Sequence, residues 1–220
     1  MSDLSNFVAS ARQQLAPILD RSGNILYSAA RTLRPGPIYL LGLNPGGDPT
    51  KHETVRHTLE ALTARVENAF LDERWERQKR PGQAPLQRRL QWLARELGFD
   101  LREVCAANLI FVRSRDASRS GYPQLADLCW PIHLSILEIV RPKLIITIGN
   151  SAISPYAYLR RQLNGSAEQL FPSGHGDWRC RVFHSASRQV VGLPHLSRYA
   201  VDHHPSVAVW LRGLLERLRT

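Results

Sequence analysis

Two patterns of apolar residues alternate along this chain, and each predicts a different kind of element. Short runs that are apolar throughout, such as 38–41 (Ile-Tyr-Leu-Leu), are typical of strands buried on both faces of a sheet. Longer segments carry apolar residues at helical spacing, as between Leu86 and Leu97, where Gly98 marks the end of the helix. The predicted strands cover 38–41, 104–112, 143–148, 179–184 and 189–193, and the predicted helices cover 4–18, 52–77 (whole or broken), 86–97, 125–140, 156–163 and 205–218.

This alternation of strands and helices predicts an α/β fold. Successive parallel strands need a crossover connection, which a helix provides. We therefore expect a three-layer α/β/α sandwich, in which helices cover both faces of a central, mostly parallel sheet of four to five strands. A turn is expected at 171–176. No repeat, low-complexity tract or long linker divides the sequence, so residues 1–220 are expected to form a single domain.

The net charge of the chain indicates which class of partner the protein binds. The formal net charge is +10, and only three of the 29 basic residues are Lys (Lys51, Lys79 and Lys143). A strongly basic, Arg-rich surface favours polyanions such as DNA, because guanidinium groups make bidentate contacts to phosphates and bases. A GC-rich coding bias also replaces Lys by Arg, so the charge alone leaves both explanations open.

Cysteine usage and hydropathy predict a cytoplasmic protein without a metal centre. Cys105, Cys129 and Cys180 have no CxxC spacing, which argues against a zinc ribbon or an iron–sulfur cluster. Cys105 and Cys129 lie in apolar segments and are expected to be small core residues. The first residues lack the pattern of a secretion signal, and no apolar run is long enough for a membrane span.

Polar groups follow four of the predicted strands. Asn44 comes after the first strand, Asn108 lies within the second, Gly149-Asn150 follows the third and His195 follows the last. Because the carboxyl ends of parallel strands meet at one edge of a sheet, we expect these residues to lie close together, where α/β proteins bind ligands. Taken alone, the Gly- and Pro-rich segment around Asn44 is equally typical of an ordinary strand-to-helix turn.

Four segments of the chain resemble motifs of the uracil-DNA glycosylase superfamily. Residues 42–46 (Gly-Leu-Asn-Pro-Gly) resemble the first motif of its mismatch-specific and single-strand-selective branches. Residues 107–113 (Ala-Asn-Leu-Ile-Phe-Val-Arg) resemble the second-strand segment, and 144–152 resemble the central strand and its turn. Residues 194–197 (Pro-His-Leu-Ser) resemble the last motif. The segments stand in the family's order over most of the chain, and the resemblance implies a uracil-DNA glycosylase-like fold.

The resemblance implies a monofunctional DNA N-glycosylase, which hydrolyses the N-glycosidic bond of a flipped-out uracil or modified pyrimidine and leaves an abasic site. Asn44 would hold the attacking water, and His195 would donate a hydrogen bond to the departing base as a neutral imidazole. Asn108 would read the pyrimidine edge, because its amide offers both a donor and an acceptor. The base site would also include Gly42, Leu43, Pro45, Gly46, Gly47 and His57.

The resemblance further implies DNA as the partner of a monomeric enzyme that needs no cofactor or metal ion. Loops would supply short hydroxyl groups and guanidinium groups to the phosphates. Tyr199, four residues beyond His195, stands where the family inserts a wedge side chain, and a Tyr there would stack in the gap left by the flipped nucleotide. The expected contacts to DNA are Arg113, Ser114, Arg115, Ser197, Arg198 and Tyr199, with further positive charge from Arg119.

Three departures from the family pattern point to an altered base pocket. Residues 54–58 contain no Phe or Tyr where the family stacks an aromatic ring on the base, which leaves His57, Phe70 or Trp75 for that role. Leu196 replaces a common Pro, and 47–49 (Gly-Asp-Pro) lack the bulky residue that some branches use against thymine. We therefore also consider a modified base, such as a hydroxymethylated or glucosylated cytosine of phage DNA, and a role in antiviral defence instead of DNA repair.

Two other classes of protein remain as alternatives. The first is a catalytically weak DNA- or lesion-binding module of the same fold, against which the presence of both Asn44 and His195 argues. The second is an unrelated α/β hydrolase or nucleotide-binding protein, which the lack of a GxSxG motif or a P-loop makes less favoured. The Lys nearest to the motifs is Lys51, so a Schiff-base lyase mechanism is not expected.

Overall fold

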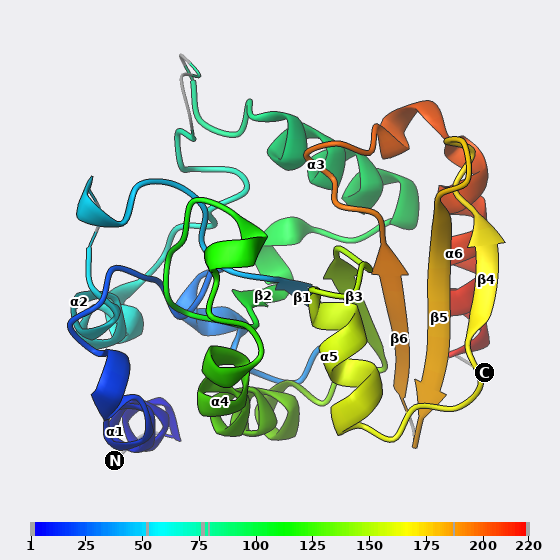
Figure 1. Ribbon diagram of the computed structural model, residues 1–220. Coiled ribbons are helices and arrows are strands. Elements are labelled where there is room, and N and C mark those ends of the chain that lie inside the picture. The colour runs from blue at the N-terminus through cyan, green and yellow to red at the C-terminus, as the bar shows by residue number, and fades with distance from the viewer. Residues whose placement is uncertain (1–2, 52, 76–77, 79, 187, 219–220) are drawn as a thin grey trace.

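A mixed six-stranded sheet lies at the centre of the structure, a computed structural model that describes residues 3–51, 53–75, 78, 80–186 and 188–218 (Figure 1). The strand order is β2-β1-β3-β6-β5-β4. Strands β2, β1, β3 and β6 are parallel to one another, whereas β5 and β4 are antiparallel to their neighbours. The strands are β1 (Ile38–Gly42), β2 (Cys105–Asn108), β3 (Leu144–Ile148), β4 (Gln169–Pro172), β5 (Arg179–Ser185) and β6 (Arg188–Leu193).

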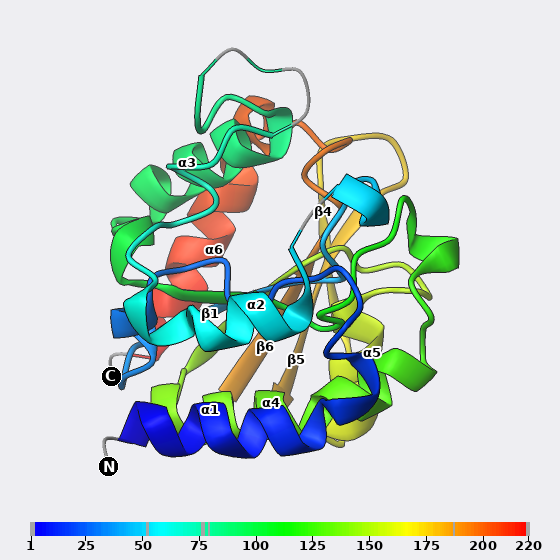
Figure 2. The same cartoon turned by 90° about the vertical axis from the view of Figure 1, so that its left-hand side faces the viewer.

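Helices cover both faces of this sheet (Figure 2). Side chains alternate along each strand, so Tyr39 and Leu41 enter one core, shared with α1, α4 and α5, and Leu40 enters the other, shared with α3 and α6. The short helix α2 adds Val55 and Leu59 to the first core. The helices are α1 (Asp3–Gln14), α2 (Val55–Glu60), α3 (Pro85–Leu97), α4 (Gln124–Val140), α5 (Pro155–Gln162) and α6 (Pro205–Arg217).

The α/β class predicted from the sequence is confirmed, but the number of strands is not. The sheet has six strands, because residues 169–172 form β4, which pairs with β5; only the first two residues of the turn expected at 171–176 belong to this strand, and the chain turns directly after it. Three of the four β4 residues are exposed, so this edge strand carries no apolar run and depends on backbone pairing. Strand β2 ends at Asn108 although the apolar run continues to Val112, because residues 109–112 are buried beyond the sheet.

Helix boundaries follow the local signals where those signals are strong. Helix α3 ends at Gly98, whose φ of 70° is left-handed, as predicted. The helix expected at 52–77, whole or broken, forms only in part: α2 is followed by one short 3₁₀ turn, Leu62–Ala64, and the bounds His52 and Arg77 lie outside the described residues. The Asn68 side chain accepts from Phe70 N and donates to Leu101 O, which turns the chain there.

The prediction that Cys105 and Cys129 are core residues is confirmed. Cys105, Cys129 and Cys180 are buried and form no disulfide, and burial raises the pKa of all three thiols. We infer that they serve as small apolar residues. Among the described helices, none has the length and apolarity that crossing a membrane requires.

Candidate active site

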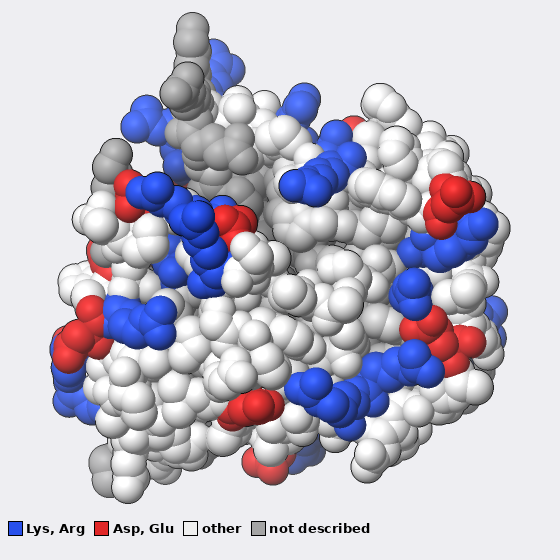
Figure 3. All heavy atoms as spheres, viewed as in Figure 1, with Lys and Arg blue, Asp and Glu red and all other residues white. Residues whose placement is uncertain are grey.

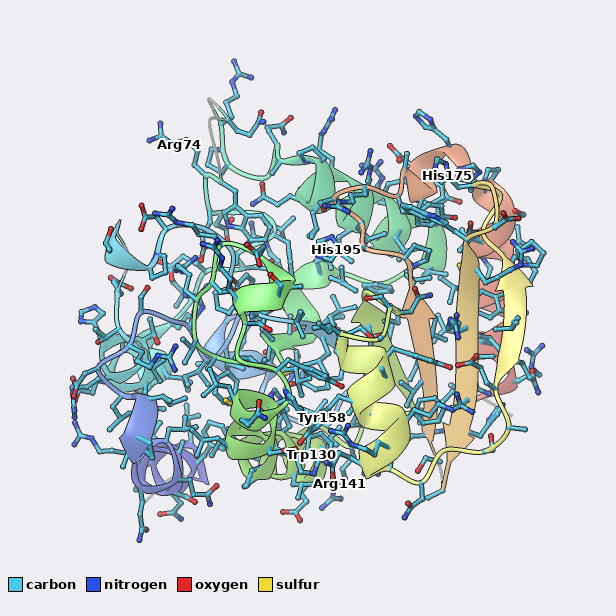
Figure 4. The ribbon with its side chains drawn as sticks, in the orientation of Figure 1. Arg74, Trp130, Arg141, Tyr158, His175 and His195 are labelled. Carbon is cyan, nitrogen blue, oxygen red and sulfur yellow. The ribbon has the colours of Figure 1, made fainter. Side chains whose placement is uncertain are left out.

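The carboxyl ends of the four parallel strands bring the predicted polar residues to one edge of the sheet. Asn108 ends β2, Asn44 follows β1 by two residues, and Gly149-Asn150 follow β3. His195 follows β6 by two residues and is labelled in Figure 4, beyond the end of that strand. Neighbouring strands lie roughly 4.8 Å apart, so β1 and β6, on either side of β3, are separated by about 10 Å.

The amide of Asn44 is held so that only its oxygen is left for a ligand. Its Nδ2 donates to Ser114 Oγ and to Pro45 O, at 2.8 Å each. Asn44 Oδ1 accepts no hydrogen bond from any residue that the structure describes, and the side chain is only part-buried. An amide fixed in this way presents a hydrogen-bond acceptor to water or to another donor.

Ser114 has a different place from the one expected for a phosphate ligand. The residue is buried, its hydroxyl donates to Asp116 O at 2.7 Å, and the same oxygen accepts from Asn44 Nδ2. Its backbone N–H donates to Pro45 O. The hydrogen bonds of Ser114 are used inside the protein, where they position Asn44, so its expected contact to DNA stays a prediction.

Asn108 brings an unpaired donor to the same edge. The residue is 7 % exposed, and its Nδ2 is buried without a hydrogen-bond partner among the described residues. Its Oδ1 lies where a Cβ on Gly42 would stand, only 2.1 Å from that position. A buried donor without a partner costs free energy, so it identifies a place where a ligand acceptor would be stabilising. Gly42 is required because no larger residue leaves room for the Asn108 amide.

Replacing Gly42 with Ala is expected to lower the free energy of unfolding by about 1–3 kcal/mol, because the new Cβ would displace the Asn108 amide. Urea denaturation measures this change. The same replacement made in an Asn108→Ala background should cost much less, since the clashing oxygen is then absent. Gly46→Ala is the control, because nothing lies within 4 Å of the Cβ it would add. Equal costs in both backgrounds would contradict the steric account.

The His195 ring is oriented by the loop that follows it. Ser197 N donates to His195 Nδ1 at 3.3 Å, and Ser197 Oγ lies 2.8 Å from the same nitrogen. A backbone N–H can only donate, so Nδ1 is the acceptor and the hydrogen of the neutral ring is on Nε2. Gly149, with φ of 111°, passes beside the ring, and a Cβ there would lie 3.8 Å from His195 Cδ2.

The electrostatic surroundings favour the neutral form of His195. The residue keeps a solvent-exposed edge, yet the protein atoms around the ring lower its pKa, and the nearby positive charge of Arg198 lowers it further. Ser197 and Arg198 are both exposed beside it. At neutral pH the loop therefore presents an uncharged imidazole whose Nε2–H points away from its anchoring bonds.

Two of the predicted site residues do not have the expected surroundings. Tyr199 is completely buried, donates to Ser173 O and stacks on His204, so it is not a surface wedge. Its apolar ring is more stable in the core than in solvent. His57 is exposed on α2 and pairs with Glu53 at 3.3 Å. Within the described part of the chain, no contact joins His57 to the Asn44, Asn108 and His195 side chains.

Tyr27, Phe70 and Trp75 form an aromatic cluster, of which the sequence analysis named Phe70 and Trp75 but not Tyr27. Tyr27 packs against Phe70 and Trp75, with ring centroids 5.7 and 5.9 Å away. Burial raises the pKa of the Tyr27 phenol to about 12, while the positive charge of Arg113 and the nearby Asn108 amide oppose this rise. Phe70 and Trp75 were recognisable as candidates, but Tyr27 belongs to no motif and reaches the site only through the fold.

Arginines line a pocket of about 490 Å³ next to the Asn44 loop. Arg113 is half-buried and donates to Gly46 O, so it holds this loop, while its Nε is buried and unpaired within the described structure. Arg115 is exposed and pairs with Asp48 at 3.3 Å. Figure 3 shows basic side chains around a mostly uncharged middle of this face. The pocket is lined by Arg21, Ser22, Asp48, Pro49, Thr50, Val112, Arg113, Ser114, Arg115 and Arg119.

Among the described residues, no group of three or more His, Cys, Asp or Glu side chains is arranged to hold a metal ion. Comparison with models of known protein families finds no match for this chain, and comparison with curated proteins finds none either. The site is therefore interpreted from its own geometry. It belongs to an α/β protein that presents two amides and one neutral imidazole at the carboxyl edge of its sheet.

Proposed function

We propose that the protein is a monofunctional DNA N-glycosylase with a fold like that of the uracil-DNA glycosylase superfamily. Its substrate would be a uracil or a modified pyrimidine flipped out of DNA. The observation that carries the proposal is that three side chains at one sheet edge each retain one unused hydrogen-bonding group. These groups are an acceptor on Asn44, a buried donor on Asn108 and the Nε2–H of His195.

These three groups match the needs of N-glycosidic hydrolysis. As the C1′–N bond breaks, its electron pair moves onto the base, and His195 Nε2–H donates to the base oxygen that gains negative charge. A water held by Asn44 Oδ1 forms the new bond to C1′ and releases its proton, which balances the charge of the departing base. Asn44 is not a base of useful strength, so its contribution is positioning. Asn108 Nδ2 would pair with an acceptor on the pyrimidine edge.

The surroundings of the site support a base larger than uracil. The pocket beside the Asn44 loop has about 490 Å³ and is lined by arginine and hydroxyl side chains. Such a lining suits a polar substituent on the pyrimidine, as in hydroxymethylated or glucosylated cytosine. Phe70 and Trp75 pack against Tyr27, whose phenol is close to Asn108, so they are preferred to the exposed His57 as candidates for stacking. Action on modified phage DNA would place the enzyme in antiviral defence instead of base excision repair.

Incubating the protein with oligonucleotides that each contain one test base examines this proposal. The bases are uracil, hypoxanthine, hydroxymethylcytosine and glucosylated hydroxymethylcytosine, and alkali-labile abasic sites are measured. We expect release of a pyrimidine, and faster release of a modified cytosine than of uracil. The Asn44→Ala variant is the matched control, because it should still bind the same DNA.

Two outcomes would contradict different parts of the proposal. Release of none of the bases, with tight and salt-sensitive DNA binding retained, would exclude the glycosylase and favour a binding module of the same fold. Efficient release of uracil with no release of the modified cytosines would retain the glycosylase and exclude the larger base.

A further inference from the structure

A second pocket, of about 390 Å³, lies behind the loop that joins β3 to α5. It is lined by Asn150 and Ser151 of this loop, by Tyr156 and Arg160 of α5 and by Arg181 of β5. The chemistry proposed above for Asn44, Asn108 and His195 uses none of these side chains. These side chains are nevertheless polar or charged, and a cavity without a ligand has no need of such a lining.

Positive charge dominates this pocket. Arg160, Arg161 and Arg181 line it together with a single acidic residue, Glu168. The Glu168 carboxylate is only 14 % exposed and pairs with Arg181 at 2.7 Å and with Arg160 at 3.5 Å. These pairs fix the Arg160 and Arg181 guanidinium groups, and two cations against one anion leave a net positive charge, while Arg161 also pairs with Asp127 at 4.0 Å. Figure 3 shows this row of basic side chains over α5 and β5.

Tyr156 adds an unpaired hydroxyl inside the pocket. The residue is 2 % exposed, and its hydroxyl has no partner at hydrogen-bond distance within the described structure. Burial, and after it the nearby Glu168 carboxylate, raise the pKa of this phenol, so it stays protonated and can donate. This buried donor without a partner stands next to the Glu168 carboxylate and to the guanidinium groups that neutralise it, and an anionic ligand held by those guanidinium groups would complete the arrangement.

The pocket adjoins the candidate active site along the backbone. Asn150 directly follows Gly149, the residue whose Cβ position lies 3.8 Å from His195 Cδ2. The Asn150 amide donates to Arg179 O at 2.7 Å and to Gly192 O at 2.9 Å, which fixes the loop between the two sites. A nucleic-acid strand whose base reaches His195 therefore has its backbone within reach of this pocket.

We propose that the pocket formed by Tyr156, Arg160, Arg161 and Arg181 holds a backbone phosphate of the DNA strand whose base enters the site at Asn44 and His195. The inference rests on the proposed function only for the identity of that strand. Guanidinium groups and a hydroxyl donor recognise a phosphate through charge-assisted hydrogen bonds, and such contacts position a strand without reading its sequence. The pocket would thereby set where the target nucleotide stands relative to His195.

Binding of a fluorescent single-stranded oligonucleotide without an excisable base, followed by anisotropy at several salt concentrations, tests the inference. Arg160→Gln should weaken binding about threefold to tenfold and should make the slope of log affinity against log salt shallower by about 0.7, the share of one phosphate. Tyr156→Phe should weaken binding roughly threefold without changing the slope, because it removes a neutral donor.

Arg188→Gln provides the matched control, because it removes the same charge at the amino end of β6, the opposite edge of the sheet. It should change the affinity and the slope by less than half as much as Arg160→Gln. Equal effects of the two variants would overturn the inference in favour of general electrostatic attraction. Saturable binding of inorganic phosphate or deoxycytidine monophosphate, lost in Tyr156→Phe while strand binding is unchanged, would overturn it in favour of a small-anion site.

The readout also separates this inference from the proposed function. If no base is released from any substrate but the pocket variants weaken strand binding as stated, the phosphate site stands and the glycosylase does not. If base release is measured but Tyr156→Phe and Arg160→Gln bind DNA like the unaltered protein, the glycosylase stands and the phosphate site does not.

Discussion

Replacing His195 with Ala is expected to lower the single-turnover rate of base release by about 100- to 1000-fold. This is the usual effect of removing one donor to a developing oxyanion. The expectation follows from the geometry of the loop, in which Ser197 N donates to Nδ1 and leaves Nε2–H for the departing base. Rapid-quench measurement with enzyme in excess of the modified oligonucleotide isolates the chemical step from product release.

Variants of the neighbouring residues make the His195 prediction specific. Ser197→Ala removes the hydroxyl near Nδ1 but keeps the backbone N–H, so the rate should fall much less than in His195→Ala. Asn44→Ala should lose a similar factor to His195→Ala, because the water would no longer be positioned. Unchanged single-turnover rates in either Asn44→Ala or His195→Ala would refute the role proposed for that residue.

A fall in pH from 7 to 4 is expected to remove up to about 3 kcal/mol of folding stability through one buried residue, His133 of α4. Burial lowers its pKa from the ordinary 6.5 to about 4. The ring is therefore neutral at pH 7 in the folded protein; Nε2 donates to Leu109 O at 3.0 Å, which leaves Nδ1 to accept from Tyr39 OH at 2.9 Å. Between these two pKa values the unfolded chain binds a proton that the folded protein does not, so stability falls as the pH falls.

Urea denaturation at several pH values between 4 and 7 measures this effect. His133→Gln cannot titrate but keeps a donor for Leu109 O, so it should be less stable at pH 7 and show a smaller loss towards pH 4. His184→Gln, at an exposed position of β5, should behave like the unaltered protein. Parallel pH dependence of the unaltered protein and His133→Gln would show that His133 is not the group responsible.

The polar side chains near the site show which of its features the sequence predicts and which it does not. Asn44, Asn108 and His195 were predictable as neighbours, because each follows or ends a predicted parallel strand. The roles of Ser114 and Tyr199 were not predictable. Ser114 stands in a basic loop and Tyr199 in a polar one, yet both side chains are buried and hydrogen-bonded within the protein. Local sequence carries no record of which residues a loop folds inward.

The strands also divide into those that the sequence predicts and one that it does not. The runs at 38–41 and 143–148 became β1 and β3, because a strand buried on both faces must be apolar throughout. Strand β4 had no such run, because it lies at an exposed edge and is stabilised by its backbone bonds to β5. The pattern of apolar residues reports burial, and a strand that is not buried leaves no pattern.

The sequence by itself determined the α/β class, the buried parallel strands and the arrival of Asn44, Asn108 and His195 at one sheet edge. The tertiary structure alone decided which hydrogen-bonding groups of these residues remain unused, since that depends on Ser114, Gly42 and Ser197 reaching them across the fold. It also decided that Tyr156 and three arginines share a pocket. The spacing of apolar residues within one helix or strand depends only on which of its faces is buried, so it can be recognised in the sequence. A site depends on contacts between elements that are far apart in the chain.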